Sequence, residues 1–437
     1  MQARFRLFSL IAATVSSEKI SFASLTYDIR YAIIVKMKQM GGDGMRTVAI
    51  VSEFNPFHNG HRYLVDSVRA KYGEDTCIIA LMSGNYTQRG DVALANKFTR
   101  AASAVLGGVD LVLEIPFPFS ASSAEFYATA GVRIAAGLGI VDTLAFGSEC
   151  GDLEVLRKAA ELLNSEGFQK AIKRAVKEEP CRGYPEITEE LLRERAGEEC
   201  AALLRDPNNV LAIEYLRANL RLGTPLEPFT VTRIGSYHST SLASLSSATA
   251  LRSALIDGNE AAYDAMPAAS ALPLREAILT GTAPATLDRL ALVFLSYIRT
   301  TPLLPDDDLG HHLRDAAIRA ADFSEFTTLV ATKRYTNAYI RRNVLHRYFG
   351  ITSADLSEAP AYTQILGMNG RGRLALRRAA RASTISLLTK PADARALTGA
   401  AARQAALSQR ADLLYPLAMP RPTPGNADVL AAPFLDE

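Results

Sequence analysis

Residues 52–61 read Ser-Glu-Phe-Asn-Pro-Phe-His-Asn-Gly-His and lie between an apolar run at 48–51 and a stretch of helical spacing at 63–71. These three segments predict a strand, a tight turn and a helix in succession. His58 and His61 are three residues apart and would lie on one face of the first helical turn. A helix N-terminus offers free N–H groups and the positive end of the helix dipole, so two imidazoles placed there suit the phosphates of a nucleotide.

Other residues of this motif have expected local roles. Pro56 is expected to make the turn, Asn59 to cap the helix, and Gly60 to let a ligand approach the backbone. Two alternatives to nucleotide binding remain open for the histidines. They could bind a metal, although the chain has six histidines and no nearby Cys or third His completes a zinc site. They could also serve only in capping and packing. We expect no metal site built from protein ligands.

Short apolar runs alternate with stretches of helical spacing throughout residues 48–146. The runs lie at 48–51, 77–82, 110–115 and 143–146, and the helical stretches lie at 63–71, 97–106 and 124–136. This alternation predicts a parallel sheet with crossover helices. Because ligands bind at the carboxyl ends of the strands in such open sheets, an α/β fold would place its site beside the histidine motif.

The rest of the chain is expected to be mostly helical. Residues 151–221 have helical patterns, residues 229–234 form a last strand, and a serine-rich loop at 236–247 leads into another helix. From Pro273 to about residue 389 the pattern predicts helices only. The Ala- and Pro-rich tail at 396–437 is expected to fray over its last residues, 420–437.

The composition excludes several classes of protein. The 437 residues include 48 Lys and Arg against 46 Asp and Glu and are 48% hydrophobic, which is a globular rather than a disordered or fibrous composition. Cys77, Cys150, Cys181 and Cys200 form no C-x-x-C pair, so we expect neither a disulfide framework nor a thiolate zinc site, and a cytoplasmic protein fits best. No apolar run reaches the roughly 20 residues that a membrane-spanning helix needs.

Residues 1–44 imitate a secretory signal, with Arg4 and Arg6 before an apolar stretch at 7–15, but they lack a convincing cleavage site. A strand pattern starts directly after Met45. We therefore expect Met45 to be the true start and residues 1–44 to be a poorly ordered extension or a mis-called start. A genuine targeting segment is the alternative.

A cation for the other side of the phosphates is predicted in residues 247–252, Ser-Ala-Thr-Ala-Leu-Arg. The hydroxyl groups of Ser247 and Thr249 would start a helix, with Arg252 one turn further in. Ser or Thr before a helix is usually only a cap, so this signal is weak alone and gains weight beside the histidine motif.

The sequence resembles the HxGH nucleotidyltransferase superfamily, in which an Asn-Pro-Phe-His-x-Gly-His segment follows a strand and a Ser-Ser-Thr-x-x-Arg signature comes later. Ala248 stands where that signature has its second serine. More narrowly, the sequence is similar to the bacterial tRNA(Met) cytidine acetate ligase family. The match runs from about residue 46 to 395 and includes further stretches at 82–90, 108–116, 146–149, 207–209, 333–336 and 365–367.

The resemblance implies a Rossmann-like nucleotidyltransferase domain and a two-step reaction. ATP activates acetate as acetyl-adenylate, and the acetyl group then passes to N4 of the wobble cytidine of elongator tRNA(Met). His58, His61 and Arg252 would be catalytic, and Mg²⁺ would be carried mainly by the ATP phosphates. Acetate is ionised at neutral pH, so the first step needs alignment and charge stabilisation more than a base.

The resemblance also implies a set of ATP contacts, for several of which local structural roles remain open. Gly147 could be only a strand-end turn, Asn208 and Asn209 a helix cap, and Arg233 a solvated edge residue. The implied contacts are Val51, Ser52, Glu53, Phe54, Asn55, Pro56, Phe57, His58, Asn59, Gly60, His61, Arg62, Tyr63, Leu64, Gly147, Asn208, Asn209, Arg233 and Thr249.

Two further groups of residues are candidates for contacts to the acceptor. Gln88, Arg89 and Lys97 follow the second predicted strand and are hypothesised to position acetate or the cytidine, with a solvated basic helix face as the alternative. Residues 333–381 carry a net charge of +8, which leaves −6 for the rest of the chain. We predict that this segment binds RNA, unless its charges only form a solvated face. Its predicted contacts are Lys333, Arg334, Arg341 and Arg342, with stacking surfaces at Tyr335, Tyr339, Tyr348, Phe349 and Tyr362.

We therefore expect an α/β nucleotide-binding domain at 46–262 with a helical insertion at 151–221, a helical tRNA-binding domain at 270–395, and the tail. Two rival functions remain: a small-metabolite adenylyltransferase, whose product would retain AMP, and an RNA-binding protein with a degenerate nucleotide site. The acid used, the identity of the tRNA and the oligomeric state do not follow from the residues themselves.

Overall fold

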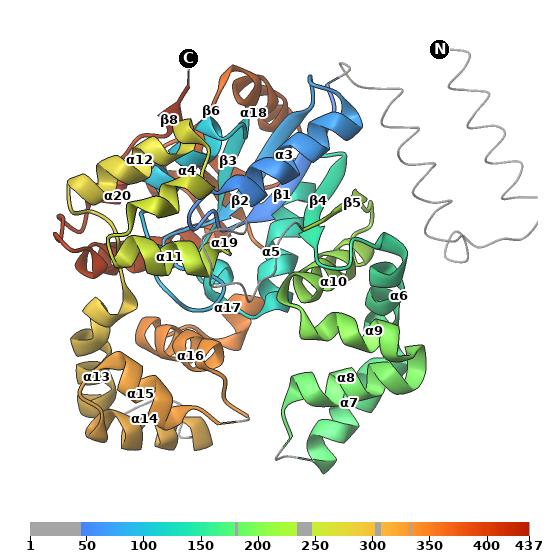
Figure 1. Ribbon diagram of the computed structural model, residues 1–437, viewed down its shortest axis with the longest axis vertical. Helices are drawn as coiled ribbons and strands as arrows, with labels where there is room; N and C mark the ends of the chain where they lie inside the picture. Colours follow the sequence, from blue (N-terminus) through green and yellow to red (C-terminus); the bar gives the residue numbers. More distant parts are fainter. Residues whose placement is uncertain (1–44, 180–181, 234–246, 302–306, 333, 437) are drawn as a thin grey trace, which may run out of the picture.

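A computed structural model describes residues 45–179, 182–233, 247–301, 307–332 and 334–436 (Figure 1). The expectations for residues 1–44, Cys181 and Lys333, and for the serine-rich loop up to residue 246, lie outside the described residues. No helix of the described part is both long and apolar enough to cross a membrane.

One sheet organises the molecule, with the strand order β5-β4-β1-β2-β3-β6-β7. The strands from β5 to β3 are parallel, and β6 pairs antiparallel to β3. The predicted parallel sheet is therefore confirmed. The strands are β1 (Thr47–Ser52), β2 (Cys77–Ser83), β3 (Leu111–Ile115), β4 (Thr143–Ser148), β5 (Glu227–Thr232), β6 (Tyr362–Met368), β7 (Ser386–Leu388) and β8 (Phe434–Leu435).

Helices cover both faces of the sheet because successive side chains of a strand point to opposite sides. Val48 and Ile50 of β1 join a core with α3 (Asn59–Tyr72) and α4 (Lys97–Leu106). Their neighbours Ala49 and Val51 face the other core, which contains α5 (Ala124–Gly137). All three predicted crossover helices are thus confirmed, and β1 with its loop is held between two buried layers.

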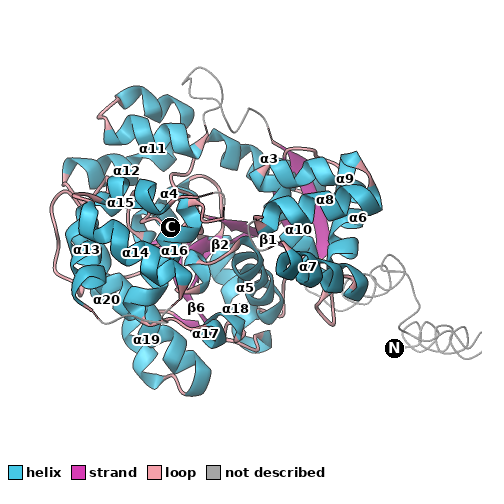
Figure 2. Cartoon of the chain, turned by 90° about the horizontal axis from the view of Figure 1, so that it is seen from below, coloured by secondary structure: helices cyan, strands magenta, loops and turns pink. Residues whose placement is uncertain are grey.

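Two helical units flank the sheet on opposite sides (Figures 1 and 2). The predicted helical stretch at 151–221 consists of α6 (Leu153–Asn164), α7 (Glu166–Glu178), α8 (Tyr184–Ala196), α9 (Glu198–Ala202) and α10 (Pro207–Leu220). The second unit follows α11 (Ala248–Ile256) and α12 (Ala268–Leu279), and its apolar core is shared with the loops after β2 and β3 and with residues 411–419. It consists of α13 (Ala291–Thr300), α14 (Asp308–Arg319), α15 (Phe323–Val330), α16 (Asn337–Phe349) and α17 (Ser353–Ser357).

The chain after α17 departs from the prediction of helices only. Residues Tyr362–Met368 form β6, which returns to the sheet beside β3, and α18 (Gly370–Ala382) packs against β2 and β3. The prediction is wrong here because β6 is buried along its whole length and so lacks the polar–apolar alternation of a half-exposed strand.

The prediction that residues 420–437 fray is also wrong. Helix α19 (Gly399–Leu414) packs against β6, and Tyr415 is fully buried. The short helix α20 (Ala427–Leu430) contributes the buried Asp428, and β8 pairs with β6. The tail is therefore part of the α/β domain, and it ends within the sheet.

Candidate functional site

The candidate site lies at the carboxyl ends of β1 and β4, where the loop after β1 turns into α3. Phe54 of this loop has a left-handed backbone, with φ of 44°, and its buried ring packs on Phe57 and His61 at centroid distances of 5.1 and 5.0 Å. A bulky residue at positive φ is strained and persists only where its surroundings hold it. The loop is therefore a fixed structure.

Two arginines hold the backbone carbonyls on either side of Phe54. Arg100 of α4 is buried and donates through Nη1 to Glu53 O (2.5 Å) and through Nη2 to Ser83 O (3.0 Å). Arg252 of α11 donates through Nη1 to Asn55 O (2.9 Å). Arg100 follows the second predicted strand, as Lys97 does, but no role in holding this loop was predicted for it.

His58, and not the predicted Asn59, caps α3. The His58 Nδ1 accepts from Gly60 N (3.0 Å), and the His61 Nδ1 accepts in turn from His58 N (3.2 Å). The two rings lie 3.9 Å apart between centroids, so the predicted shared face is confirmed. A Cβ on Gly60 would lie 2.8 Å from His58 Cε1, which is too close. Residue 60 is therefore a glycine because the His58 ring folds back over it.

These contacts fix the chemistry of both imidazoles. Because each Nδ1 is an acceptor, the proton of each neutral ring must be on Nε2, which makes Nε2–H a donor. Burial, followed by the charges of Arg233 and Arg252, lowers the pKa of His58 to about 3. Burial, followed by His58 and Arg233, lowers the pKa of His61 well below its usual value. The pair is therefore neutral at pH 7 and presents hydrogen-bond donors beside two guanidinium groups.

The structure brings the second predicted motif onto this loop. Ser247 caps α11, and Arg252 donates through Nη2 to Thr249 Oγ1 (3.0 Å) while its Nη1 holds Asn55 O. Thr249 and Arg252 thus stand at the histidine loop although almost 200 residues separate them in sequence. Their contacts to phosphates stay predictions.

Gly147 and Arg233 lie on the neighbouring strand ends. The Arg233 N–H donates to Ser148 O (2.9 Å), and a Cβ on Gly147 would lie 3.1 Å from Arg233 Cγ. Arg233 also acts electrostatically on both histidines. Arg233 is therefore close to the site, and Gly147 leaves room for its side chain.

Asn208 and Asn209 bind the turn that follows β4. Glu149 Oε1 accepts from Asn208 Nδ2 (2.6 Å), and Glu149 Oε2 accepts from the Asn209 N–H (2.7 Å). The Cys150 N–H donates to the Asn209 Oδ1 (3.1 Å), and Asn209 is buried. Both residues thus anchor the turn locally, and a contact to ATP stays a prediction for each.

The remaining residues of the predicted ATP segment divide by position. The side chains of Val51, Phe54, Asn55, Pro56 and Phe57 are buried, as is that of His58, and their contacts to ATP stay predictions. Ser52, Glu53, Asn59, Arg62 and Leu64 are partly exposed, and Tyr63 is 40% exposed.

The loop after β2 joins the site to the second helical unit. The Gln88 N–H donates to Glu53 Oε1 (2.7 Å), and Arg342 Nη1 of α16 donates to Gln88 O (3.1 Å). Arg341 lies 3.9 Å from Asp91. A Cβ on Gly90, which has φ of 71°, would lie 2.5 Å from Arg342 N, so this loop and α16 are in close contact. Gln88 therefore contacts Glu53 at the start of the histidine loop, whereas Arg341 and Arg342 contact the loop after β2, and Arg89 acts electrostatically on Arg342.

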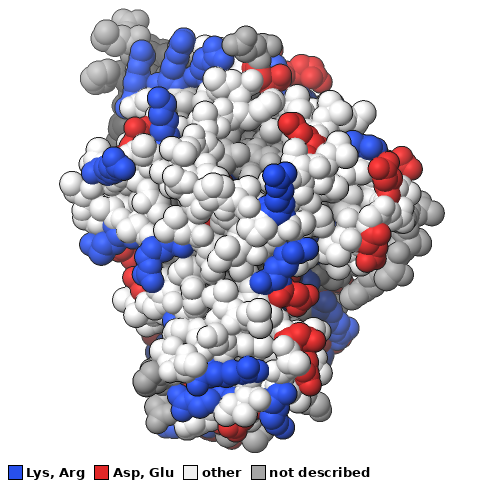
Figure 3. Space-filling model, turned by 90° about the vertical axis from the view of Figure 1, so that its left-hand side faces the viewer, with Lys and Arg blue, Asp and Glu red and all other residues white. Residues whose placement is uncertain are grey.

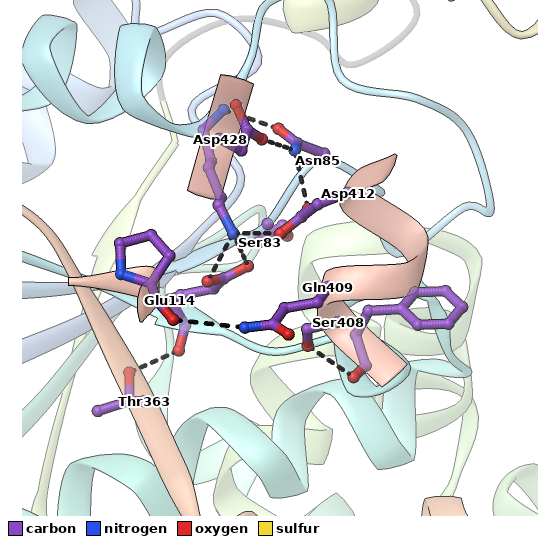
Figure 4. Close-up of polar contacts among 12 residues, drawn as sticks. Ser83, Asn85, Glu114, Thr363, Ser408, Gln409, Asp412 and Asp428 are labelled. Carbon is purple, nitrogen blue, oxygen red and sulfur yellow. Dashed lines mark hydrogen bonds and ion pairs between the residues drawn. The ribbon is translucent and has the colours of Figure 1, made fainter. Parts of the chain in front are cut away.

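Lys97 lies in a buried polar cluster with Glu114 and Asp412. Figure 4 shows the carboxyl groups of Glu114, Asp412 and Asp428 gathered near Asn85. Its Nζ donates to Glu114 Oε1 and Oε2 (3.1 and 3.0 Å) and to Asp412 Oδ2 (2.7 Å). Asn85 Nδ2 donates to Asp412 Oδ1 (2.9 Å) and to Asp428 Oδ2 (2.5 Å). Lys97 is 1% exposed, so the alternative of a solvated basic face is wrong for it. Any effect on acetate or cytidine would be indirect, because the ammonium group already binds three carboxylate oxygens.

Charge and burial set the protonation of this cluster. Burial alone would lower the pKa of Lys97, but the charges of Asp412 and Glu114 outweigh it and raise that pKa above its usual value. Burial raises the pKa of Glu114 to about 7, although Lys97 acts in the opposite direction. The cluster therefore holds a charged lysine and a carboxyl group that titrates near neutrality.

The basic segment 333–381 does not form one surface. Helix α16 touches the loop after β2, whereas α18 starts at the opposite edge of the sheet, where Arg371 lies 3.3 Å from Asp110 (Figure 1). On the face in Figure 3, Lys and Arg side chains form separate groups with uncharged surface between them. Arg334 is 3.3 Å from Asp308, on a third element. The arginines of α18 are thus separated from the candidate site.

Comparison with known proteins agrees with this arrangement. The family model described as HIGH Nucleotidyl Transferase matches residues 45–428. The tRNA(Met) cytidine acetate ligase of Acetivibrio thermocellus is 33% identical over 372 residues, which are 80% of this chain and 89% of that protein. The tRNA(Met) cytidine acetate ligase of Syntrophomonas wolfei is 35% identical over 350 residues, which are 75% and 83%.

Two crystal structures of Thermotoga maritima TmcAL have the same fold. The structure bound with alpha-thio ATP has a TM-score of 0.81 and 27% sequence identity, and it covers 90% of this chain and 99% of that chain. The apo structure has a TM-score of 0.83 and 28% identity with the same coverage.

Proposed function

The chain belongs to the HIGH nucleotidyl transferase family and, within it, to the tRNA(Met) cytidine acetate ligases, and from this membership we propose its reaction. ATP activates acetate as acetyl-adenylate, and the acetyl group passes to N4 of the wobble cytidine of elongator tRNA(Met). The observation that carries the proposal is the convergence of His58, His61 and Arg252 at the carboxyl end of β1. The comparison that supports it is the fold shared with a protein crystallised with an ATP analogue.

In the first step, an oxygen of acetate attacks the α-phosphorus of ATP, and the bond to the pyrophosphate oxygen breaks. Negative charge then moves onto the departing pyrophosphate. The Nε2–H groups of His58 and His61 donate hydrogen bonds to phosphate oxygens, and Arg252 supplies a positive charge beside them. No proton has to be removed from acetate, because its carboxyl group is ionised at neutral pH.

Neutral imidazoles suit this role. A histidine that gave up its proton as an acid would need a pKa near the working pH, whereas the apo site depresses both pKa values. The histidines therefore act as fixed donors and leave the positive charge to Arg252 and Arg233. Mg²⁺ would be carried mainly by the ATP phosphates.

In the second step, the N4 amine of the cytidine attacks the acyl carbon of acetyl-adenylate, the bond from that carbon to the phosphate oxygen breaks, and AMP leaves while the nitrogen loses one proton. The loop with Gln88 and Arg89 lies between the histidine loop and α16. The cytidine is proposed to enter the site next to this loop. Arg341 and Arg342 of α16 would bind RNA phosphates near it. The protein would act in the cytoplasm, where ATP and tRNA are found together.

The experiment supplies ATP, Mg²⁺, isotopically labelled acetate and unmodified elongator tRNA(Met), and measures labelled N4-acetylcytidine by mass spectrometry. The wild type is expected to transfer label, and His61→Ala to lose about 100-fold in rate because one fixed donor is removed. The matched control is His311→Ala, whose side chain is exposed on α14.

Three results would contradict the proposal in different ways. Cleavage of ATP to AMP and pyrophosphate without label in RNA would support the activation step but contradict tRNA(Met) as the acceptor. A product that retains AMP would support a metabolite adenylyltransferase. RNA and ATP binding without any turnover would support a binding protein with a degenerate site.

A further inference from the structure

An exposed aromatic ring stands on α16, the helix that contacts the loop after β2. Tyr339 is 40% exposed, and its ring is stacked on that of Tyr335, with an interplanar angle of 9° and a centroid distance of 5.7 Å. Tyr335 is 6% exposed, and its hydroxyl donates to Asp308 Oδ2 (2.7 Å). Tyr339 is therefore an exposed ring backed by a second ring that is itself fixed.

The other aromatic residues of the basic segment do not offer such a surface. Phe349 and Tyr362 are 4% and 2% exposed. Tyr348 is partly buried and packs edge-on against Phe294 and Tyr297, at centroid distances of 5.3 and 5.2 Å. Among the aromatic side chains described between residues 334 and 381, Tyr339 alone is classed as exposed.

The charges around Tyr339 link it to the site. Arg342 lies one helical turn further along α16 and interacts electrostatically with both Tyr339 and Arg89. The same guanidinium group donates to Gln88 O in the loop next to the histidines. Burial lowers the pKa of Arg342 to about 10, so it stays charged at neutral pH. An aromatic surface with adjacent fixed cations is the combination that binds a single-stranded nucleic acid.

We propose that Tyr339 is a stacking surface for one unpaired base of the RNA acceptor, next to the base that is acetylated. This inference rests on the proposed function, because it takes an anticodon loop as the ligand. Stacking would use the ring face turned away from Tyr335, while Arg342 meets a neighbouring phosphate. Tyr339 would thereby hold the loop in register and contribute nothing to ATP binding.

The test uses the absence of tryptophan from the chain. Tyr339→Trp introduces a single tryptophan, whose emission should be quenched when a base stacks on it. Tyr184→Trp is the control, because Tyr184 is 51% exposed on α8 and outside the basic segment. Addition of elongator tRNA(Met) should quench the first variant and leave the second unchanged, and a fully paired RNA duplex should quench neither.

Steady-state kinetics provide the second readout. Tyr339→Ala should raise the KM for tRNA about tenfold, because a stacked base contributes that order of affinity. Tyr339→Phe should keep the wild-type KM, and the KM for ATP should be unchanged in both variants. If the ring served only to pack on Tyr335, Tyr339→Ala would instead lower stability without a selective rise in the KM for tRNA.

The outcomes separate this inference from the proposed function. Normal acetylation with an unchanged KM for tRNA in Tyr339→Ala, or equal quenching of both tryptophan variants, would overturn the inference and leave the function standing. Absence of acetylation in the wild type would overturn the function. Selective quenching of Tyr339→Trp in that case would still support a stacking surface for unpaired RNA.

Discussion

Replacement of Lys97 by methionine should destabilise the protein by about 3–5 kcal/mol, the usual cost of removing one partner from a buried ion pair. Methionine keeps most of the side-chain volume and removes only the charge. Three hydrogen bonds to Glu114 and Asp412 are lost, and the three buried carboxyl groups of Glu114, Asp412 and Asp428 are left without their cation. The free energy of unfolding would be measured from urea titrations followed by circular dichroism.

The loss should depend on pH. Burial already raises the pKa of Glu114 to about 7, and removal of Lys97 should raise it further. A carboxyl group with a raised pKa in the folded state stabilises the fold below its unfolded pKa, and this contribution disappears as the pH rises. The difference between Lys97→Met and the wild type should therefore be larger at pH 8 than at pH 5.

Two controls make the reasoning refutable. Lys170→Met removes a lysine that is 2.6 Å from Glu166 but lies at the surface, so little change is expected. Adding Glu114→Gln to Lys97→Met should restore part of the stability, because it removes one uncompensated charge. A loss below about 1 kcal/mol that is independent of pH would refute the role of Lys97 as a buried counterion. If Lys97→Met folds normally but fails in acetate activation, the hypothesis of a positioning role gains support.

Three further changes test the contacts around the site. Gly90→Ala should destabilise more than Gly350→Ala in urea titrations, since the two glycines have φ of 71° and 69° but only the Cβ at Gly90 would strike Arg342 N; equal losses would contradict the close contact with α16. Gly60→Ala should weaken ATP binding about tenfold by calorimetry, because its Cβ would displace the His58 ring, and an unchanged Kd would show that His58 does not meet ATP. Burial, with Arg342, lowers the pKa of His346 to about 4, so the wild type should lose up to about 1.4 kcal/mol per pH unit below pH 6.5 relative to His346→Gln; parallel stability curves between pH 7 and 5 would show that His346 is not buried as a neutral ring.

Local patterns predicted those elements whose signal lies within a short stretch of chain. The predicted helix at 97–106 coincides with α4, and the run at 77–82 lies within β2. Each strand and its following helix form a unit whose apolar spacing is visible in the sequence. The histidine pair was predicted to share a face for the same reason, since residues three apart always meet on a helix.

Long-range partners explain what the sequence did not predict. Gln364 and Thr363 lie in β6, whose antiparallel partner β3 is about 250 residues earlier, so no local pattern marks the strand. The tail is buried because Asp412 meets Lys97, which is 315 residues away. The net charge of residues 333–381 predicted one basic surface that included both α16 and α18. Strand β6 lies between these helices in the chain and runs antiparallel to β3, so α18 begins at the opposite end of the strands from the candidate site.

The contacts of the histidine loop indicate why its two motifs are found together. Arg100 and Arg252 hold the carbonyls of residues 53 and 55, and Phe54 between them has the positive φ that turns the chain toward α3. The loop thus depends on a cation from α4 and on another from α11. Arg252 uses one Nη for Asn55 and the other for Thr249, and these bonds occupy two of the five N–H groups of a guanidinium. The same side chain can therefore hold the loop and meet an anion, so loss of Arg252 should disturb both the histidine geometry and the charge balance of the site.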